Sequence, residues 1–471
     1  MKINRFDISP DNRENRRRLK GAAVAVLGAA RSGIALAELL AKNGARVLLS
    51  DIRGEHYLEY DVQPLRDMGV QLEFGGHSTQ VLRAELICIS PGLPLTIPIL
   101  RQAAALKIPV LGELEVASWF VDAPVIAITG SNGKTTTTTL TAEILKQRYP
   151  NLLVGGNIGT PLAKLVQENP KPPAALLEVS SFQLETIANF HPRTAVIMNL
   201  SPNHLDRYPN YEAYVEAKLN ILSNLTEADV LIYNDDDQYL AHRIGEAAPR
   251  KLPVSTRGNL SEGAYWKDKA IQIVSDGKRY NIPLSGTHIR GPHNRYNMTV
   301  AALLGILNEV PPEKIRQVIE KFPGIEHRLE FVREIDGVRF FNDSKATTVA
   351  SLGYALQSFE EPIVLIAGGK DKGGDFSELN PLIKQQVRSV VLIGEAAGRM
   401  KNAWEGIIPL TEVADLEAAV NIAYQQSQPG DVVLLSPACS SFDMFPNYEA
   451  RGRKFKDEVN LLAVKATGMT V

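Results

Sequence analysis

The chain has 471 residues, of which 44% are hydrophobic and 22% are charged, and its formal net charge is −2. A single hydrophobic core rarely grows beyond roughly 250–300 residues, so this length predicts about three globular domains. The near-neutral charge argues against a broad nucleic-acid surface, and the lack of a run of about 18 apolar residues argues against a membrane span.

Residues 22–51 predict a strand, a glycine turn, a helix and a second strand that ends at Asp51. This order is typical of a dinucleotide-binding unit, in which glycines let a pyrophosphate approach the helix N-terminus. Gly28 and Gly33 fit that pattern, but Ala30 replaces the middle glycine and its Cβ obstructs the approach. A structural Rossmann-like unit and a nucleotide site are both open here. A nicotinamide-dependent dehydrogenase would rest on this stretch alone.

Residues 125–146 predict a strand, a phosphate-binding loop and a helix, with the loop sequence TGSNGKTT. Gly130 and Gly133 let successive backbone N–H groups face one concavity at the positive end of the helix dipole. Lys134 would neutralise the β- and γ-phosphates, and the Thr135 hydroxyl would reach Mg2+. The first glycine of the full Walker pattern is missing, so this is a variant loop. We expect it to bind a nucleotide.

Polar residues follow the next predicted strands. Glu178 lies in the apolar strand of AALLEVSS, and His204 and Asp206 come just past the strand of TAVIMNLSPNHLD. In open parallel sheets ligands bind beyond the carboxyl ends of the strands, so these side chains should surround the phosphate loop. Each alone is typical of a solvated residue. Together they indicate a metal shell of hard oxygen ligands and one imidazole.

Lys218 falls on the apolar face of a predicted helix, four residues after Tyr214 and four before Leu222. A lysine in this position commonly extends its ammonium group to solvent. A buried, unprotonated amine has another option, because it can take up CO2 and become a carbamate that binds metal. Both interpretations are open from the sequence.

Residues 249–292 predict short strands and turns, a small β-rich patch that closes the second domain. The helix that follows has Asn294 and Asn297 in its first turn, where such amides often act as caps. Pro323 and Gly324 interrupt the next helix and predict a hinge.

The remaining sequence alternates strands and helices four times, and each strand leads into a loop of small, polar or charged residues. We therefore predict an α/β fold of three domains, each built on a mainly parallel sheet with flanking helices. These are a Rossmann-like N-terminal domain (1–122), a P-loop ATPase-like central domain (123–323) and a Rossmann-like C-terminal domain (324–471).

Three loops together, TGSNGKTT, NDSKATT and SPACSSFDMFPNYEARG, resemble those of the ATP-dependent Mur ligases. The resemblance runs in order through essentially the whole chain. The first loop is shared with the folylpolyglutamate synthetases, whereas NDSKATT and SPACSSFD point to glutamate-adding members. It implies ATP-dependent joining of D-glutamate to UDP-N-acetylmuramoyl-L-alanine through an acyl phosphate, in peptidoglycan precursor synthesis. Because parts come from three domains, it also implies closure around the reacting groups.

The resemblance also implies roles for individual residues. The ATP-binding residues would be Gly130, Ser131, Asn132, Gly133, Lys134, Thr135, Thr136, Asn294, Asn297, Arg328 and Asp343. The metal ligands, for Mg2+ or alternatively Mn2+, would be Thr135, Glu178, His204 and a carboxylated Lys218. The UDP part would contact Arg31, Ser32, Asp51 and Arg53, with Asn157 holding the substrate between domains. D-Glutamate would meet Thr347, Lys372, Ser441, Phe442 and Tyr448. The catalytic residues would be Lys134, His204, Lys218 and Lys345.

Two rival interpretations accompany this one. A nucleotide-switched binding module predicts ATP binding without amino-acid-dependent turnover, and a folylpolyglutamate synthetase is the nearest rival among the ligases. The two cysteines, Cys88 and Cys439, each flank an apolar run and predict a reducing cytoplasm without a disulfide framework. We expect a cytoplasmic monomer with no nucleic-acid and no membrane partner.

Overall fold

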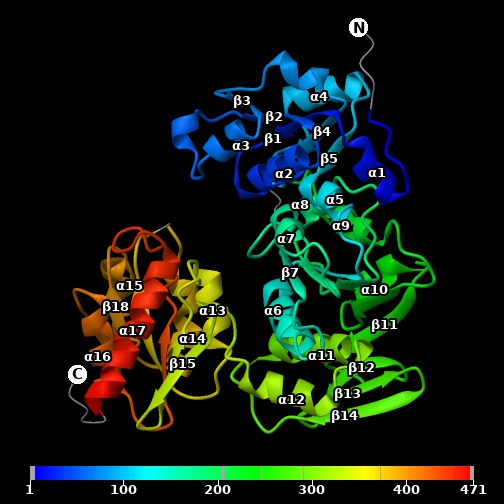
Figure 1. Cartoon of the computed structure of the whole chain (residues 1–471). Coiled ribbons are helices and arrows are strands. Elements are labelled where there is room, and N and C mark those ends of the chain that lie inside the picture. Colours follow the sequence, from blue (N-terminus) through cyan, green and yellow to red (C-terminus); the bar gives the residue numbers. More distant parts are fainter. Residues whose placement is uncertain (1–5, 203–206, 246, 290, 372, 467–471) are drawn as a thin grey trace. The chain divides into compact units, whose positions relative to one another are not determined.

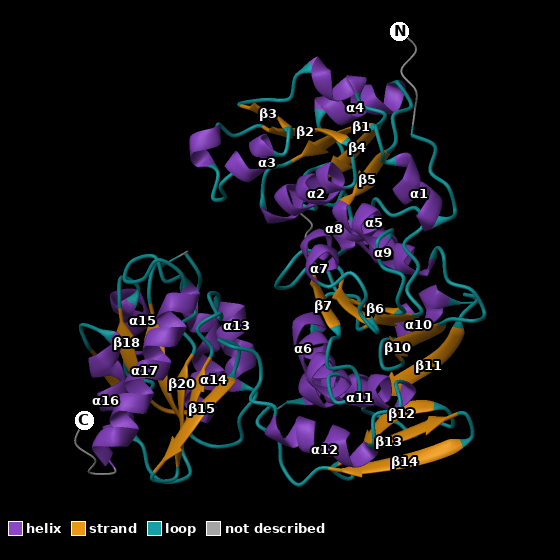
Figure 2. Cartoon of the chain, viewed as in Figure 1, coloured by secondary structure: helices purple, strands orange, loops and turns teal. Residues whose placement is uncertain are grey.

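The computed structural model describes residues 6–202, 207–245, 247–289, 291–371 and 373–466 (Figure 1). The chain forms two compact units: residues 1–282 with 299–315, and residues 283–298 with 316–471. Three mainly parallel sheets, each packed against helices, account for most of the described strands (Figure 2). The predicted α/β class is confirmed, while the exact domain boundaries stay predictions.

The first sheet has the strand order β3-β2-β1-β4-β5, and all its pairs are parallel. Its central strands AVAVL and LICI are buried almost throughout, as expected for strands covered on both faces. The elements are α1 (Asn12–Arg18), β1 (Ala23–Leu27), α2 (Arg31–Lys42), β2 (Arg46–Asp51), η1 (Glu55–Tyr57), α3 (Gln63–Asp67), β3 (Gln71–Phe74), η2 (Thr79–Arg83), β4 (Leu86–Ile89), α4 (Pro98–Ala105), β5 (Val110–Gly112) and α5 (Glu113–Ser118).

The second sheet has nine strands in the order β14-β13-β12-β11-β10-β9-β6-β8-β7. Its first elements are β6 (Val125–Thr129), α6 (Lys134–Leu145), β7 (Leu153–Gly156), α7 (Leu162–Glu168), β8 (Ala175–Glu178), α8 (Ser181–Leu184), β9 (Thr194–Ile197), α9 (Tyr211–Leu219) and η3 (Asn220–Leu222). They are followed by β10 (Val230–Asn234), α10 (Gln238–Ile244), β11 (Arg250–Ser255), β12 (Gly263–Lys267), β13 (Ala270–Ser275), β14 (Lys278–Pro283), α11 (Pro292–Leu307) and α12 (Pro312–Lys321).

The strands predicted within 249–292 are present, and they extend this second sheet at one edge. β11 pairs parallel with β10, and β12 pairs parallel with β11 and antiparallel with β13. The residue pattern within 249–292 indicates strands but not the strands they pair with. The partner of β11 is β10, and helix α10 lies between the two in sequence.

The third sheet has the order β15-β16-β20-β17-β18-β19, and only its β15–β16 pair is antiparallel. Its elements are β15 (Glu330–Ile335), β16 (Val338–Asn342), α13 (Val349–Leu356), β17 (Ile363–Gly368), η4 (Phe376–Leu379), α14 (Asn380–Gln386), β18 (Val387–Ile393), α15 (Ala397–Trp404), β19 (Leu410–Glu412), α16 (Leu416–Gln426), β20 (Val432–Leu435) and α17 (Tyr448–Ala466). In the described part of the chain, no helix combines the length and apolar character needed to cross a bilayer.

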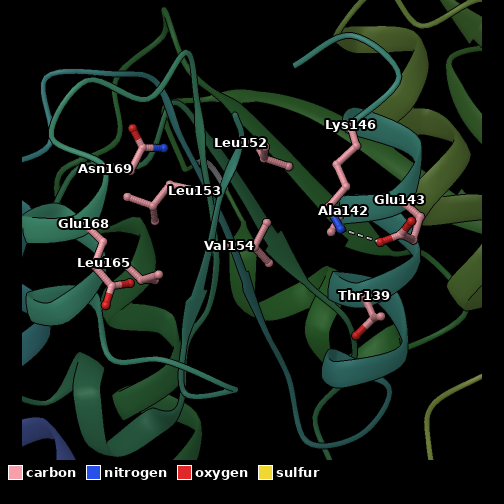
Figure 3. Close-up of a pocket in the computed structure, with 10 residues that line it drawn as sticks. All are labelled: Thr139, Ala142, Glu143, Lys146, Leu152, Leu153, Val154, Leu165, Glu168 and Asn169. Atoms are coloured by element: carbon pink, nitrogen blue, oxygen red, sulfur yellow. Dashed lines mark hydrogen bonds and ion pairs between the residues drawn. The ribbon is translucent and has the colours of Figure 1, made fainter. Parts of the chain in front are cut away.

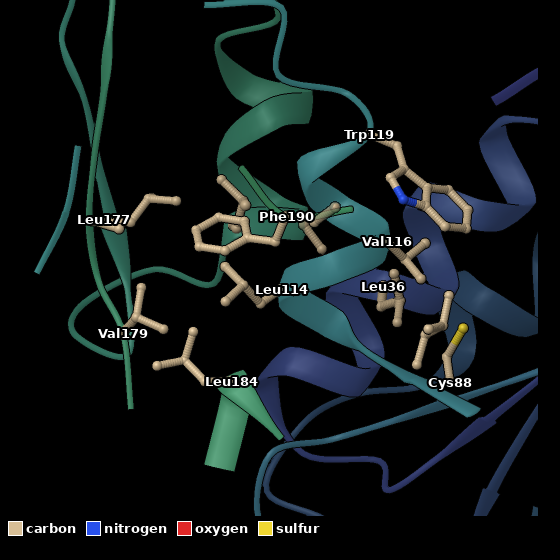
Figure 4. Close-up of a cluster of buried hydrophobic side chains, with 14 of the residues drawn as sticks. Leu36, Cys88, Leu114, Val116, Trp119, Leu177, Val179, Leu184 and Phe190 are labelled. Atoms are coloured by element: carbon tan, nitrogen blue, oxygen red, sulfur yellow. The ribbon is translucent and has the colours of Figure 1, made fainter. Parts of the chain in front are cut away.

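The first two sheets share one hydrophobic core, in which α5 is the common element (Figure 4). Leu114 and Trp119, on and just after α5, are fully buried and belong to the same cluster as Cys88 of β4 and Leu177 of β8. Because apolar burial is the main favourable term in folding, this shared core stabilises the first two domains together.

Glu115 of α5 adds a polar connection within this core. Its carboxylate is fully buried and accepts hydrogen bonds from the backbone N–H groups of Ala188, Asn189 and Phe190 and from Nε1 of Trp119. The charge is therefore compensated by four donors that face inward.

We expect Glu115→Ala to lower the melting temperature of the first unit by roughly 5–10 °C, because buried donors would lose their acceptor. Differential scanning calorimetry measures this shift. Glu143→Ala is the control, since its ion pair with Lys146 is exposed and should matter by about 1 °C or less. Equal melting temperatures for both variants would contradict this role of Glu115.

Candidate active site

The phosphate loop follows β6, and its backbone depends on two glycines. Gly130 has φ 148° and Gly133, which directly precedes α6, has φ 81°. A Cβ at Gly130 would lie 2.7 Å from Cβ of Met198, so a side chain there would collide with the residue that follows β9. The predicted order of strand, glycine loop and helix beginning at Lys134 is confirmed.

Residues 199–201, which follow β9, hold this loop in place. The backbone carbonyl of Asn199 accepts from the Ser131 N–H at 3.0 Å. Its side-chain Oδ1 accepts from the Asn132 N–H at 2.9 Å. Ser131 Oγ donates to the Ser201 carbonyl at 3.0 Å and is 2.9 Å from the Tyr214 hydroxyl. These contacts fix the loop before any phosphate binds, which reduces the ordering cost of binding.

Two lysines converge on the Gly130 carbonyl. Lys134 Nζ donates to it at 2.8 Å and to the Ser131 carbonyl at 3.1 Å, and Lys218 Nζ donates to it at 2.9 Å. Lys218 is only 2% exposed, so of the two interpretations left open by the sequence the structure shows the buried lysine. Burial, and to a lesser degree the charge of Lys134, lowers the pKa of Lys218 to about 7, against the opposing effect of Glu178. A sizeable fraction of this amine is therefore neutral near pH 7.

Glu178 ends β8 beside this loop. One carboxylate oxygen accepts from Asn157 Nδ2 at 2.9 Å, while the other is buried with no hydrogen-bond partner. An unpaired buried carboxylate oxygen is costly unless a cation meets it, so this atom fits a Mg2+ ligand. Thr135 stands in the first turn of α6, and His204 lies outside the described residues. Within the described ranges, no three His, Cys, Asp or Glu residues form a metal cluster.

In the first domain, the strand order reverses between β1 and β4, and a ligand crevice is expected at such a switch point. Arg31 and Ser32 begin α2 beyond β1, and Asp51 ends β2. Asp51 accepts from the Ala29 N–H at 2.7 Å and from Arg53. Despite the opposing effect of burial, these bonds lower the pKa of Asp51 to about 2. The four residues predicted to contact UDP thus lie at the same edge of the first sheet, at the start of α2 and at or just after the end of β2.

The third sheet reverses its strand order between β17 and β20. The residues predicted to bind D-glutamate follow β16, β17 and β20 in sequence. Asp343 is buried and accepts from the Leu329 N–H and from Ser436 Oγ. Burial raises the pKa of Asp343 to about 7, although these bonds and Arg328 lower it. Lys345 Nζ lies 5.6 Å from the ring centroid of Tyr448.

The remaining predicted residues of this unit differ in exposure. Ser441 is buried, Thr347 is half-buried and Phe442 is 67% exposed. Lys372 lies outside the described residues. The side chains of Asn294 and Asn297 are buried, and Asn297 Nδ2 donates to Asn294 Oδ1 at 2.9 Å.

Arg451 lies in the motif SPACSSFDMFPNYEARG, and the sequence alone indicates no role for it. It is 1% exposed and donates to the backbone carbonyls of Ser344, Cys439 and Ser440 and to Ser344 Oγ. Burial lowers its pKa to about 10, so it stays charged at neutral pH. It therefore clamps the loops after β16 and β20 together. No local pattern distinguishes it from the exposed arginine two positions later.

A cavity of about 330 Å3 lies away from these loops, between α6, β7 and α7 (Figure 3). Apolar side chains such as Leu153 and Leu165 line it, with Glu143, Lys146 and Glu168 among the polar ones. It includes none of the predicted site residues, and we assign it no role in the reaction.

Comparison with known proteins places the chain in a family. Family profiles match in three segments: the Mur ligase MurD-like N-terminal domain (22–112), the Mur ligase middle domain (128–305) and the Mur ligase glutamate ligase domain (327–439). Solved structures agree in fold, including UDP-N-acetylmuramate–alanine ligase from Thermotoga maritima, with TM-score 0.56, 18% identity and coverage of 94% and 100% of the two chains. MurF from Acinetobacter baumannii gives TM-score 0.58 at 18% identity, covering 87% of this chain and 91% of that one.

Two curated relatives are much closer in sequence. UDP-N-acetylmuramoylalanine–D-glutamate ligase from Salinibacter ruber is 43% identical over 449 residues, covering 93% of this chain and 97% of the relative. The enzyme of the same name from a Geobacter species is 42% identical over 442 residues, covering 94% and 98%. At this identity and coverage, the chain belongs to the Mur ligase family and stands with its UDP-N-acetylmuramoylalanine–D-glutamate ligases.

Proposed function

We propose that the protein joins D-glutamate to UDP-N-acetylmuramoyl-L-alanine through an acyl phosphate and releases ADP and phosphate, in peptidoglycan precursor synthesis. The observation that carries the reaction type is the meeting of Lys134, Lys218 and Glu178 at the phosphate loop. The names of the relatives supply the substrates and favour this activity over that of a folylpolyglutamate synthetase. Its two cysteines are both buried and neither forms a disulfide, which suits a cytoplasmic enzyme, and we propose that it acts as a monomer.

ATP would bind with its phosphates on the N–H groups of the loop from Gly130 to Thr136. The alanyl carboxylate attacks the γ-phosphorus, the bond to the bridging oxygen breaks, and ADP leaves. Lys134 would leave its two carbonyl partners and neutralise charge on the transferring group. The amine of D-glutamate, held by the third domain, then attacks the acyl carbon, phosphate leaves and the amine loses a proton.

Thr135, Glu178 and His204 would hold Mg2+, or alternatively Mn2+, together with Lys218 as a carbamate. The bound metal would supply positive charge to the phosphoryl oxygens. The carbamate forms when the neutral Nζ attacks CO2 and releases a proton to water, which turns a cation into an oxygen ligand. Its support is the burial and lowered pKa of Lys218, together with the unpaired oxygen of Glu178 nearby.

The proposed substrates are tested by phosphate release with ATP and UDP-N-acetylmuramoyl-L-alanine across candidate amino acids. We expect turnover with D-glutamate and at least about a hundredfold lower kcat/KM with L-glutamate, L-lysine or glycine, because each leaves polar groups of a closed site unpaired. Equal use of both glutamate enantiomers would contradict the assignment. ATP binding without any amino-acid-dependent turnover would favour a nucleotide-switched binding module.

Lys134→Ala should lower kcat by at least about a thousandfold with an unchanged melting temperature, because it removes charge from the phosphate site and leaves the glycine backbone intact. The matched control is Lys146→Ala, near the other end of the same helix, which should keep wild-type turnover. Near-normal turnover by a folded Lys134→Ala enzyme would rule out the central role of this lysine.

Lys218→Arg should be inactive, because arginine keeps a positive charge and cannot form the carbamate. Lys218→Ala should regain activity when acetate is supplied to fill the space of the missing carboxylate, measured as phosphate release against acetate concentration. Acetate should not restore Lys134→Ala, where the missing group is a cation. An active Arg variant, or no acetate effect on Lys218→Ala, would make Lys218 a structural lysine.

A further inference from the structure

Arg207 lies between β9 and α9 of the second domain, but its guanidinium binds backbone of the first domain. Nη1 donates to the Gly92 carbonyl and Nη2 to the Leu93 carbonyl, both at 2.9 Å. These carbonyls are consecutive in the loop that follows β4. Because the donors of a guanidinium form a rigid planar fork, two adjacent bonds fix both the position and the orientation of that loop.

The guanidinium is itself oriented by neighbouring side chains. It lies 4.4 Å from the ring centroid of Phe182, and Nη2 is 3.5 Å from a carboxylate oxygen of Glu185. Both side chains lie on or directly after α8, which begins three residues beyond Glu178. The second domain therefore presents the donors of Arg207 in one arrangement, with the ring and the carboxylate offsetting its charge.

The loop that Arg207 binds forms one wall of the switch point in the first sheet. Ser90 Oγ donates to the Gly28 carbonyl at 3.1 Å. A Cβ added to Gly28 would lie 2.9 Å from Cδ1 of Leu93. Gly28 opens the turn that leads to Arg31, so the placement of Leu93 sets the position of this turn. This is the crevice to which the UDP part of the substrate is assigned.

Tyr208, the residue after Arg207, connects this part of the second domain to the phosphate loop through aromatic rings. Tyr208 stacks on Phe182 at 5.8 Å and meets Tyr214 edge-on at 5.5 Å. The Tyr214 hydroxyl is 2.9 Å from Ser131 Oγ in the phosphate loop. A continuous set of contacts thus joins the loop after β4 to the loop that holds ATP.

We propose that Arg207 is a positioning residue: it sets the loop of residues 91–94 on the second domain so that the sugar nucleotide presents its carboxylate to the phosphate loop. This role rests on the proposed function for the identity of the substrate. Arg207 touches no reacting atom and acts through Gly92 and Leu93.

Steady-state kinetics of three variants test this role. Arg207→Met removes both donors and keeps much of the side-chain volume. Arg207→Lys keeps the positive charge but loses the planar pair of donors. Arg46→Met is the matched control. Arg46 also donates to a first-domain carbonyl, that of Gly21, but its side chain is 74% exposed and remote from the switch point.

We expect Arg207→Met to raise the KM for UDP-N-acetylmuramoyl-L-alanine by roughly tenfold or more, with an intermediate value for Arg207→Lys. The KM for ATP and the half-saturating Mg2+ concentration should stay within about twofold, and Arg46→Met should match wild type. An unchanged KM for the sugar nucleotide, or equal shifts for ATP and Mg2+, would overturn the proposal.

Hydrogen–deuterium exchange of the ligand-free protein supplies a readout that needs no turnover. Peptides covering residues 88–97 should exchange faster in Arg207→Met than in wild type or Arg46→Met, because the loop loses two bonds from the second domain. Unchanged exchange in this segment would overturn the proposal even if activity fell. A wild-type enzyme without D-glutamate-dependent turnover would instead defeat the proposed function, and the exchange result would still decide whether Arg207 holds this loop.

Discussion

The loops that follow neighbouring parallel strands lie at the same edge of a sheet. Where the strand order reverses, two adjacent loops run in opposite directions and leave a crevice between them. In this chain the reversals fall between β1 and β4, between β6 and β9, and between β17 and β20. The Gly28 turn, the phosphate loop and the 436–443 segment each follow one of these strands. We propose that the sugar nucleotide, ATP and the amino acid bind in crevices at these three reversals, one at each.

These crevices hold buried charge at a cost to stability. Glu178 has an unpaired carboxylate oxygen, Lys218 is nearly fully buried beside Lys134, and the hydrogen bonds of Arg451 go to carbonyl and hydroxyl oxygens. Burying a charge is unfavourable unless a partner compensates it. Ligands of opposite charge, a divalent cation at Glu178 and phosphates at Lys134, would supply that compensation. The lowered pKa of Lys218 beside the phosphate loop is the kind of shift that is often found at functional sites.

Local sequence patterns predicted much of this arrangement. The helix that begins at Lys134 and the strand that ends at Asp51 each follow from periodicity or glycine placement within about twenty residues. The same periodicity puts Lys218 on an apolar helix face but leaves open whether its amine is buried or reaches solvent. Long-range partners could not be found in that way. Arg207 and Arg451 look like ordinary surface arginines in sequence, but each donates to a backbone carbonyl more than a hundred positions away. The extension of the second sheet by β11 was missed for the same reason. The ligand contacts of individual residues stay predictions.

The most direct test of the account follows the oxygen atoms of the substrate. UDP-N-acetylmuramoyl-L-alanine labelled with 18O in its alanyl carboxylate is converted with ATP and D-glutamate, and the phosphate released is analysed by mass spectrometry. Activation as an acyl phosphate predicts one labelled oxygen in each phosphate, because the carbon–oxygen bond breaks when the amine attacks. Phosphate without label, formed alongside the amide product, would contradict the mechanism assigned to this site.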